Sequence, residues 1–171
     1  MLNPPMQPVP MLQTVMDFLV KDDWNFELVK PERVESPVQG ESGMWLCGVE
    51  IARERFCVVY SYCPLAIPIA HRPSMAEFIT LANYGLFIGN FEMDFRDGEL
   101  RFKTSLDVGE SDLTVPLVQP LIYHNVATMD EYLPGIMAVV HGGVSPRIAV
   151  AQIERTGDGL AESNEFDGRV S

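Results

Sequence analysis

Apolar and polar residues alternate on both sides of Asp97-Gly98, a dipeptide that readily adopts the positive φ angles of a tight hairpin turn. The alternation predicts a β-hairpin within 83–107 that buries one face and exposes a charged one. A turn at these two residues pairs Arg96 with Glu99, Phe95 with Leu100, Asp94 with Arg101, Met93 with Phe102 and Glu92 with Lys103. The side chains expected in the core are Phe91, Met93, Phe95, Leu100, Phe102 and Leu106.

A second hairpin is predicted from two β-branched and aromatic runs, 44–51 and 56–63, that flank Ala52-Arg53-Glu54-Arg55. A symmetric two- or four-residue loop places Ile51 opposite Phe56, and both faces are then apolar. The bulkier face is expected to form the core: Trp45, Cys47, Val49, Ile51, Phe56, Val58, Tyr60 and Tyr62. The smaller face, centred on Leu46, Gly48, Cys57 and Val59, is a candidate dimer or partner surface, although a helix of the same chain is an equal alternative cover.

Helical spacing of apolar residues predicts a helix that begins at Pro10 and ends near Lys21, and a long helical region over 115–141 that Pro134 breaks or kinks. Ser74 and Glu77 have the spacing of a capping box, which predicts a second helix that Gly85 closes. Residues 26–30 are expected to form a short strand, 31–43 a loop, and 146–154 a terminal helix. The predicted fold class is therefore α+β: an antiparallel sheet with helices, in the order helix, three strands, helix, two strands, helices.

The length of 171 residues suits one domain. Prolines in 1–10 predict a proline-rich arm, 11–154 form the α+β domain, and polar, acidic residues in 155–171 predict a disordered tail. A net charge of −12 disfavours binding to nucleic acid and to anionic membranes. The three cysteines lack metal-ligand spacing, and no apolar run is long enough to cross a membrane. We therefore expect a cytoplasmic protein without a cofactor or metal.

Three segments of the chain resemble one family of bacterial proteins. The segments are R-P-S-M-A-E-F-I-T-L-A-N-Y-G-L-F-I-G-N-F-E-M-D-F-R-D-G-E-L-R-F-K at 72–103, D-E-Y-L-P-G-I-M-A-V-V-H-G at 130–142 and A-V-A-Q-I-E at 149–154. They are similar to the YbjN domain family. The resemblance implies a fold like that of type III secretion chaperones, a curved antiparallel sheet with helices, which agrees with the element order above. It also implies a role as a proposed regulator of sensory transduction. The family supplies no catalytic residues.

Candidate catalytic chemistry is scattered along the chain. His124 and His141 are about 25 Å apart on a straight helix, which is too far for one metal ion. Asp130 is expected to cap a helix that begins before Leu133. The amide of Asn83 is expected to tie the end of its helix to 85–90, with contact to a ligand as the alternative.

The sequence therefore predicts a non-enzymatic protein-interaction module, chaperone-like or regulatory, that forms a homodimer and binds a protein or peptide. The alternative is a small-ligand sensor or an enzyme with a pocket near His71, Asn83 and Tyr84.

Overall fold

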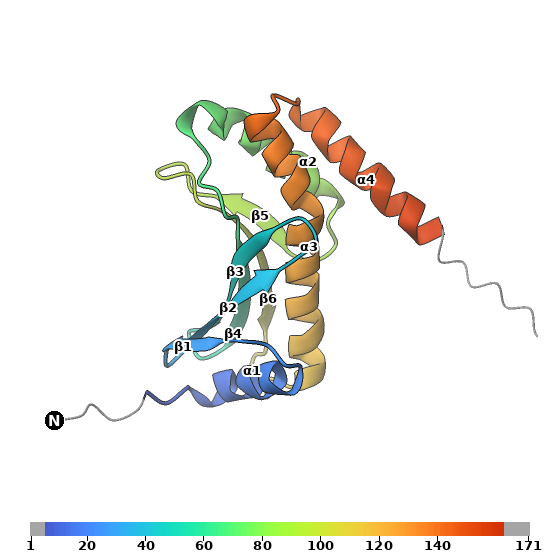
Figure 1. Ribbon diagram of the computed structural model, residues 1–171. Helices are drawn as coiled ribbons and strands as arrows, with labels where there is room; N and C mark the ends of the chain where they lie inside the picture. The colour runs from blue at the N-terminus through green and yellow to red at the C-terminus, as the bar shows by residue number, and fades with distance from the viewer. Residues whose placement is uncertain (1–5, 163–171) are drawn as a thin grey trace, which may run out of the picture.

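The computed structural model describes residues 6–162, of which 156–162 are described by their backbone alone. Six strands and four α-helices follow one another, with a short 3₁₀ helix before the second α-helix (Figure 1). The elements are α1 (Pro10–Lys21), β1 (Glu27–Lys30), β2 (Arg33–Gln39), β3 (Met44–Ala52), β4 (Phe56–Tyr62), η1 (Ile69–His71), α2 (Arg72–Gly85), β5 (Asn90–Met93), β6 (Leu100–Asp107), α3 (Val115–His141) and α4 (Pro146–Glu162).

The strands form one antiparallel sheet in the order β1-β2-β3-β4-β6-β5. Helix α3 runs along this sheet and contacts β4 and β6, while α1 contacts β2 and β3 at one end and α2 contacts β5 at the other (Figure 1). All three helices pack against the face that carries the alternating buried residues Val49, Val59 and Phe102. The predicted α+β class is confirmed, with one more strand before α2 than expected.

The additional strand is β2, which replaces the loop predicted for 31–43. Pro37 and two nearby glycines favoured a loop, yet β2 pairs with β3 along its whole length. The proline is tolerated because β1 pairs with β2 only from Arg33 to Glu35. Beyond Glu35 one side of β2 is a sheet edge, where a missing backbone N–H breaks no ladder bond.

The β5–β6 hairpin forms where it was predicted, but its register differs by two residues. Phe91 pairs with Phe102 and Met93 with Leu100, and 94–99 form a longer loop than the expected two-residue turn. A shift of two residues leaves every side chain on its predicted face, because side chains alternate with a period of two. Only Phe95, which lies in the loop and is 58% exposed, fails to reach the core.

The β3–β4 hairpin shows the opposite outcome, because its register differs by one residue. Ala52 pairs with Phe56 across a three-residue turn, and Arg53 and Glu54 in this turn have positive φ angles. A shift of one residue reverses the faces of β4 relative to β3. Val59 therefore joins the core, and Tyr60 lies on the opposite face of the sheet.

Helix α2 begins at Arg72, two residues before the predicted cap, and no side chain caps it. The capping box at Ser74 is therefore wrong: Pro73 already lies in the first turn, where its missing N–H costs nothing. The helix ends at Gly85 as predicted. In its last turn, Asn83 donates from Nδ2 to the carbonyl of Phe91 over 3.0 Å and accepts that residue's N–H over 2.7 Å. The predicted structural role of Asn83 is confirmed.

Helix α3 continues for 27 residues through Pro120 and Pro134, so of the two outcomes predicted at Pro134, a break or a kink, the break does not occur. Figure 1 shows that the axis of its second half leans away from that of the first half. The helix joins two apolar cores: its first half packs with α1 and β2–β4, and its second half with α2, α4 and β5–β6. At Gly135 an added Cβ would lie 2.5 Å from Ile153, so this glycine permits the close approach of α4.

Helix α4 extends to Glu162, past the predicted start of the tail at 155. The remainder of the tail, 163–171, and residues 1–5 of the predicted arm lie outside the described residues. The domain boundaries at 10 and 154 stay predictions.

Candidate functional site

One face of the sheet has no helix over it among the described elements, and we call it the open face. It carries the side chains of alternate residues on β2–β6. They include Arg33, Glu35, Met44, Leu46, Glu50, Tyr60, Tyr62, Glu92, Arg101 and Lys103. Aromatic, methionine and arginine side chains of this kind are enriched in protein interfaces. Met44 is 61% exposed and Leu46 39%, so apolar surface is available at one edge.

Arginine side chains pack against the two tyrosines of the open face. The guanidinium carbon of Arg101 lies 4.3 Å from the centre of the Tyr60 ring. Arg33 lies 5.6 Å from the centre of the Tyr62 ring and donates from Nη2 to the Tyr62 hydroxyl over 3.1 Å. These contacts hold both tyrosine rings in fixed orientations. The two side chains therefore lose less conformational entropy when a partner binds.

The charges of the open face balance one another. Arg33 pairs with Glu35 and Glu50, and both Arg101 and Lys103 pair with Glu92. Burial alone would raise the pKa of Glu92, but hydrogen bonds from Lys103 and Arg101 outweigh it and lower that pKa. Glu92 is therefore ionised and neutralised at pH 7. The face carries little net charge, although the chain as a whole carries −12.

The candidate dimer surface proposed from sequence does not form. Leu46 and Gly48 do lie on the open face, but Cys57 and Val59 have no exposed surface and pack in the core beneath α1 and α3. The one-residue register shift at the β3–β4 turn separates the two pairs. The same shift places Tyr60 and Tyr62, which were expected in the core, on the open face.

The alternative pocket also does not form. His71 directly precedes α2, and Tyr84 lies near its other end, about 20 Å away at 1.5 Å per residue. Tyr84 is 96% exposed, and the Asn83 amide is engaged with Phe91. None of the five main pockets in the described part of the chain is lined by two of these three residues.

The cysteines are free thiols in apolar surroundings, as predicted. Burial raises the pKa of Cys47 to about 12 and that of Cys57 to about 12, so both stay protonated at pH 7. Within 6–155 no cluster of three or more histidine, cysteine or carboxylate side chains has the geometry of a metal site. None of the described helices is long and apolar enough to cross a membrane.

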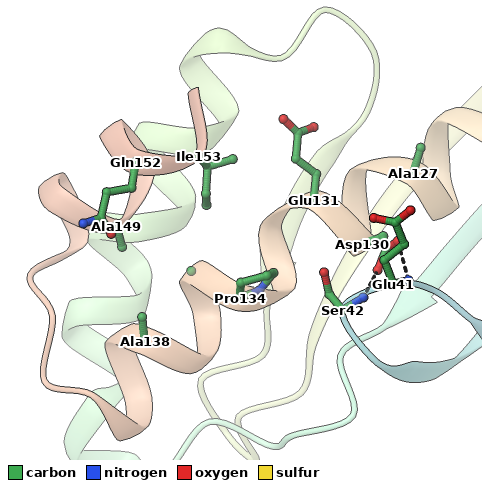
Figure 2. Close-up of a pocket in the computed structure, with 11 residues that line it drawn as sticks. Glu41, Ser42, Ala127, Asp130, Glu131, Pro134, Ala138, Ala149, Gln152 and Ile153 are labelled. Atoms are coloured by element: carbon green, nitrogen blue, oxygen red, sulfur yellow. Dashed lines mark hydrogen bonds between the residues drawn. The ribbon is translucent and has the colours of Figure 1, made fainter. Parts of the chain in front are cut away.

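A groove of about 780 Å³ lies between α3 and α4 (Figure 2). One wall is formed by α3 with Ala127, Glu131, Pro134 and Ala138, and the other by α4 with Ala149, Gln152 and Ile153. The β2–β3 loop closes one end with Glu41 and Ser42. Sequence reasoning missed this groove, because its residues come from three separate segments and share no local pattern.

Asp130 anchors the loop end of this groove. It lies in the middle of α3 and caps no helix, contrary to the prediction; its carboxylate accepts the backbone N–H groups of Glu41 over 2.9 Å and Ser42 over 2.8 Å (Figure 2). Gly40 lies against it, where an added Cβ would come within 2.3 Å of Oδ1. A side chain of α3 thus supplies the hydrogen-bond acceptors for two backbone N–H groups of a loop that is about 90 residues away in sequence.

Replacing Asp130 with alanine is expected to lower the free energy of unfolding by about 1 kcal/mol, because two hydrogen bonds to a carboxylate are lost at an exposed site. Amide hydrogen exchange of Glu41 and Ser42 should accelerate, whereas exchange in the β3–β4 turn should not change. Asparagine at 130 keeps one acceptor oxygen and should give an intermediate effect. Unchanged exchange at both amides in the alanine variant would contradict the assignment.

Within residues 6–162, helices cover one face of an antiparallel sheet and leave the other uncovered, and this architecture defines the class of α+β protein. Its fold is similar to that of YbjN from E. coli, described as a proposed transcription regulator: the TM-score with that crystal structure is 0.58, over 78% of this chain and 94% of the YbjN chain, at 12% sequence identity. Neither the protein-family models nor the curated proteins contain a match to the chain. The resemblance noted in the sequence is therefore confirmed at the level of the fold.

Proposed function

We propose that this protein is a non-enzymatic interaction module that binds a protein partner on the open face of its sheet. The observation that carries the proposal is the half-buried pair Tyr60 and Tyr62, held in place by Arg101 and Arg33, with the exposed side chains of Met44 and Leu46 on the same face. Tyrosine and arginine are the residues most often found at energetic centres of interfaces. The fold likeness to YbjN agrees with a regulatory or chaperone-like role.

The charge distribution supports a protein partner in preference to nucleic acid. A nucleic acid would meet a chain with a net charge of −12, whereas the basic side chains of the open face are already paired with glutamates. A second copy of this chain is the first candidate partner. Two acidic copies repel each other over most of their surfaces, but they can meet at the neutral open face without this repulsion. The free thiols fit a cytoplasmic location.

A photo-crosslinking amino acid, p-benzoylphenylalanine, placed at Tyr62 tests the proposal in cells of the source organism. Its side chain extends the phenyl ring by a benzoyl group, which can project from the open face into solvent, so the fold should be preserved. We expect a covalent protein adduct from position 62 and none from Tyr123, a control site on α3 that is 38% exposed. An adduct of about twice 19.1 kDa identifies a homodimer, and any other mass identifies a different partner.

A second substitution tests whether the open face itself forms the contact. Met44→Asp places a charge on this face at a residue that is 61% exposed, so folding should be unaffected and the adduct from position 62 should disappear. No adduct from position 62, or equal adducts from positions 62 and 123, would overturn the proposal.

A further inference from the structure

The groove between α3 and α4 is a second surface, separate from the open face. Its two walls are helices that pack against each other near Gly135 and Ile153. The walls are mostly apolar and small, with Ala127 and Ala138 on α3 and Ala149 on α4. Side chains of this size leave a shallow channel into which another helix can bring its backbone close to the floor.

The ionisable side chains that line the groove are all acidic. Glu41 and Glu131 lie at its rim, and neither forms an ion pair within the described part of the chain. Glu131 keeps exposed surface, and its partial burial against the groove raises its pKa, with no neighbouring cation to offset this effect. Asp130, the third carboxylate, is satisfied by the β2–β3 loop.

We propose that this groove binds an amphipathic helix of a partner protein, with apolar residues toward Ala138 and Ile153 and with lysine or arginine side chains toward Glu131 and Glu41. Helices that bind in grooves present apolar anchors at spacings of three, four and seven residues, and the channel between α3 and α4 suits such a row. The acidic rim selects a basic helix and disfavours an acidic one. The proposal concerns a different surface from the open face, so either can hold without the other.

A small organic cation such as a polyamine could also satisfy the carboxylates, but it would leave the apolar walls exposed to water. Ala149 and Ile153 are already buried, but Ala127, Pro134 and Ala138 keep apolar surface in contact with water, and only an apolar occupant gains free energy by covering it. A helix with both basic and apolar residues satisfies the rim and the walls together, and we therefore place a helix in the groove.

The test uses the full chain and a synthetic helical peptide composed of alanine, leucine and lysine, with lysines on one face. Binding is measured by isothermal titration calorimetry at physiological salt, and the contact surface is mapped by NMR amide shifts. We expect saturable binding, with shifts at Ala138 and Ala149. The pKa of Glu131 should fall on binding, because a lysine ammonium then lies beside it.

Glu131→Lys is expected to weaken binding of this peptide at least tenfold. Glu27→Lys, which makes the same change of charge at an exposed site on β1, is the matched control and should weaken it less than twofold. The same peptide with glutamate in place of every lysine should not bind. Three results would overturn the proposal. They are no saturable binding of the peptide, equal weakening of its binding by both variants, or displacement of the bound peptide by spermine as effective as its displacement by more of the same peptide.

Discussion

Replacing Asn125 with aspartate is expected to lower the free energy of unfolding by about 3–5 kcal/mol at pH 7, as measured by urea denaturation. Asn125 is fully buried on α3, and its Nδ2 donates to the carbonyls of Val59 over 3.0 Å and Phe102 over 3.2 Å. A third acceptor, the Thr104 hydroxyl oxygen, lies at 3.3 Å and has donated its own hydrogen to Leu121. Aspartate is nearly identical in shape, but it would direct a negatively charged oxygen at all three acceptor oxygens.

The pH dependence of this variant separates the electrostatic cause from a change in packing. Burial raises the pKa of the introduced carboxyl in the folded state above the value of about 3.9 in the unfolded chain. Its protonated form can still donate one hydrogen bond, so the variant should be least destabilised below about pH 4 and should lose stability as pH rises through the folded pKa. Introducing aspartate at the neighbouring exposed His124 should cost little. An equal cost for Asn125→Asp at pH 4 and pH 7 would contradict this account.

Gly98→Val is expected to destabilise the fold by about 2–5 kcal/mol, for two reasons that add. Gly98 has a φ angle of +84°, which costs a β-branched residue about 1–2 kcal/mol. A Cβ at this position would also lie 2.2 Å from the backbone carbonyl oxygen of Ile67, whose own N–H donates to the Gly98 carbonyl over 2.8 Å. Relieving that clash displaces backbone and costs about 1–3 kcal/mol more.

Gly109→Val is the matched control for the second cause. Gly109 has a φ angle of +60°, but an added Cβ would meet no atom within 4 Å. This variant should therefore show the conformational strain alone, about 1–2 kcal/mol. Thermal or urea unfolding of the two variants checks the comparison. Equal losses would show that the contact with Ile67 adds nothing.

Local patterns in the sequence were sufficient for the type of most elements. The β5–β6 hairpin was predicted with its turn near Gly98, and an error of two residues in its register did not change which face of Phe91 and Phe102 is buried. Asn83 was correctly expected to bind the backbone beyond α2, because that contact spans only eight residues. The burial of Cys47 and Cys57 and the partial burial of Cys63 followed from their apolar neighbours alone.

The pairing register of β3 and β4 could not be predicted from the sequence pattern. Both strands are apolar on both faces, so hydrophobic alternation does not distinguish one pairing from the next. The three-residue turn at 53–55, with two residues at positive φ, decided the register and placed Tyr60 and Tyr62 outside. The candidate surface at Cys57 and Val59 failed for this reason.

By itself the sequence determined what depends on neighbours along the chain: the helical stripe of α1, the strand character of β3–β6, and the alternation that separates core from surface within one strand. Only the tertiary structure decided what depends on distant contacts. Strand β2 forms despite Pro37 because β3 supplies its partners, and Asp130 binds a loop about 90 residues away. The open face and the α3–α4 groove exist because packing brings together side chains whose spacing in the sequence carries no period.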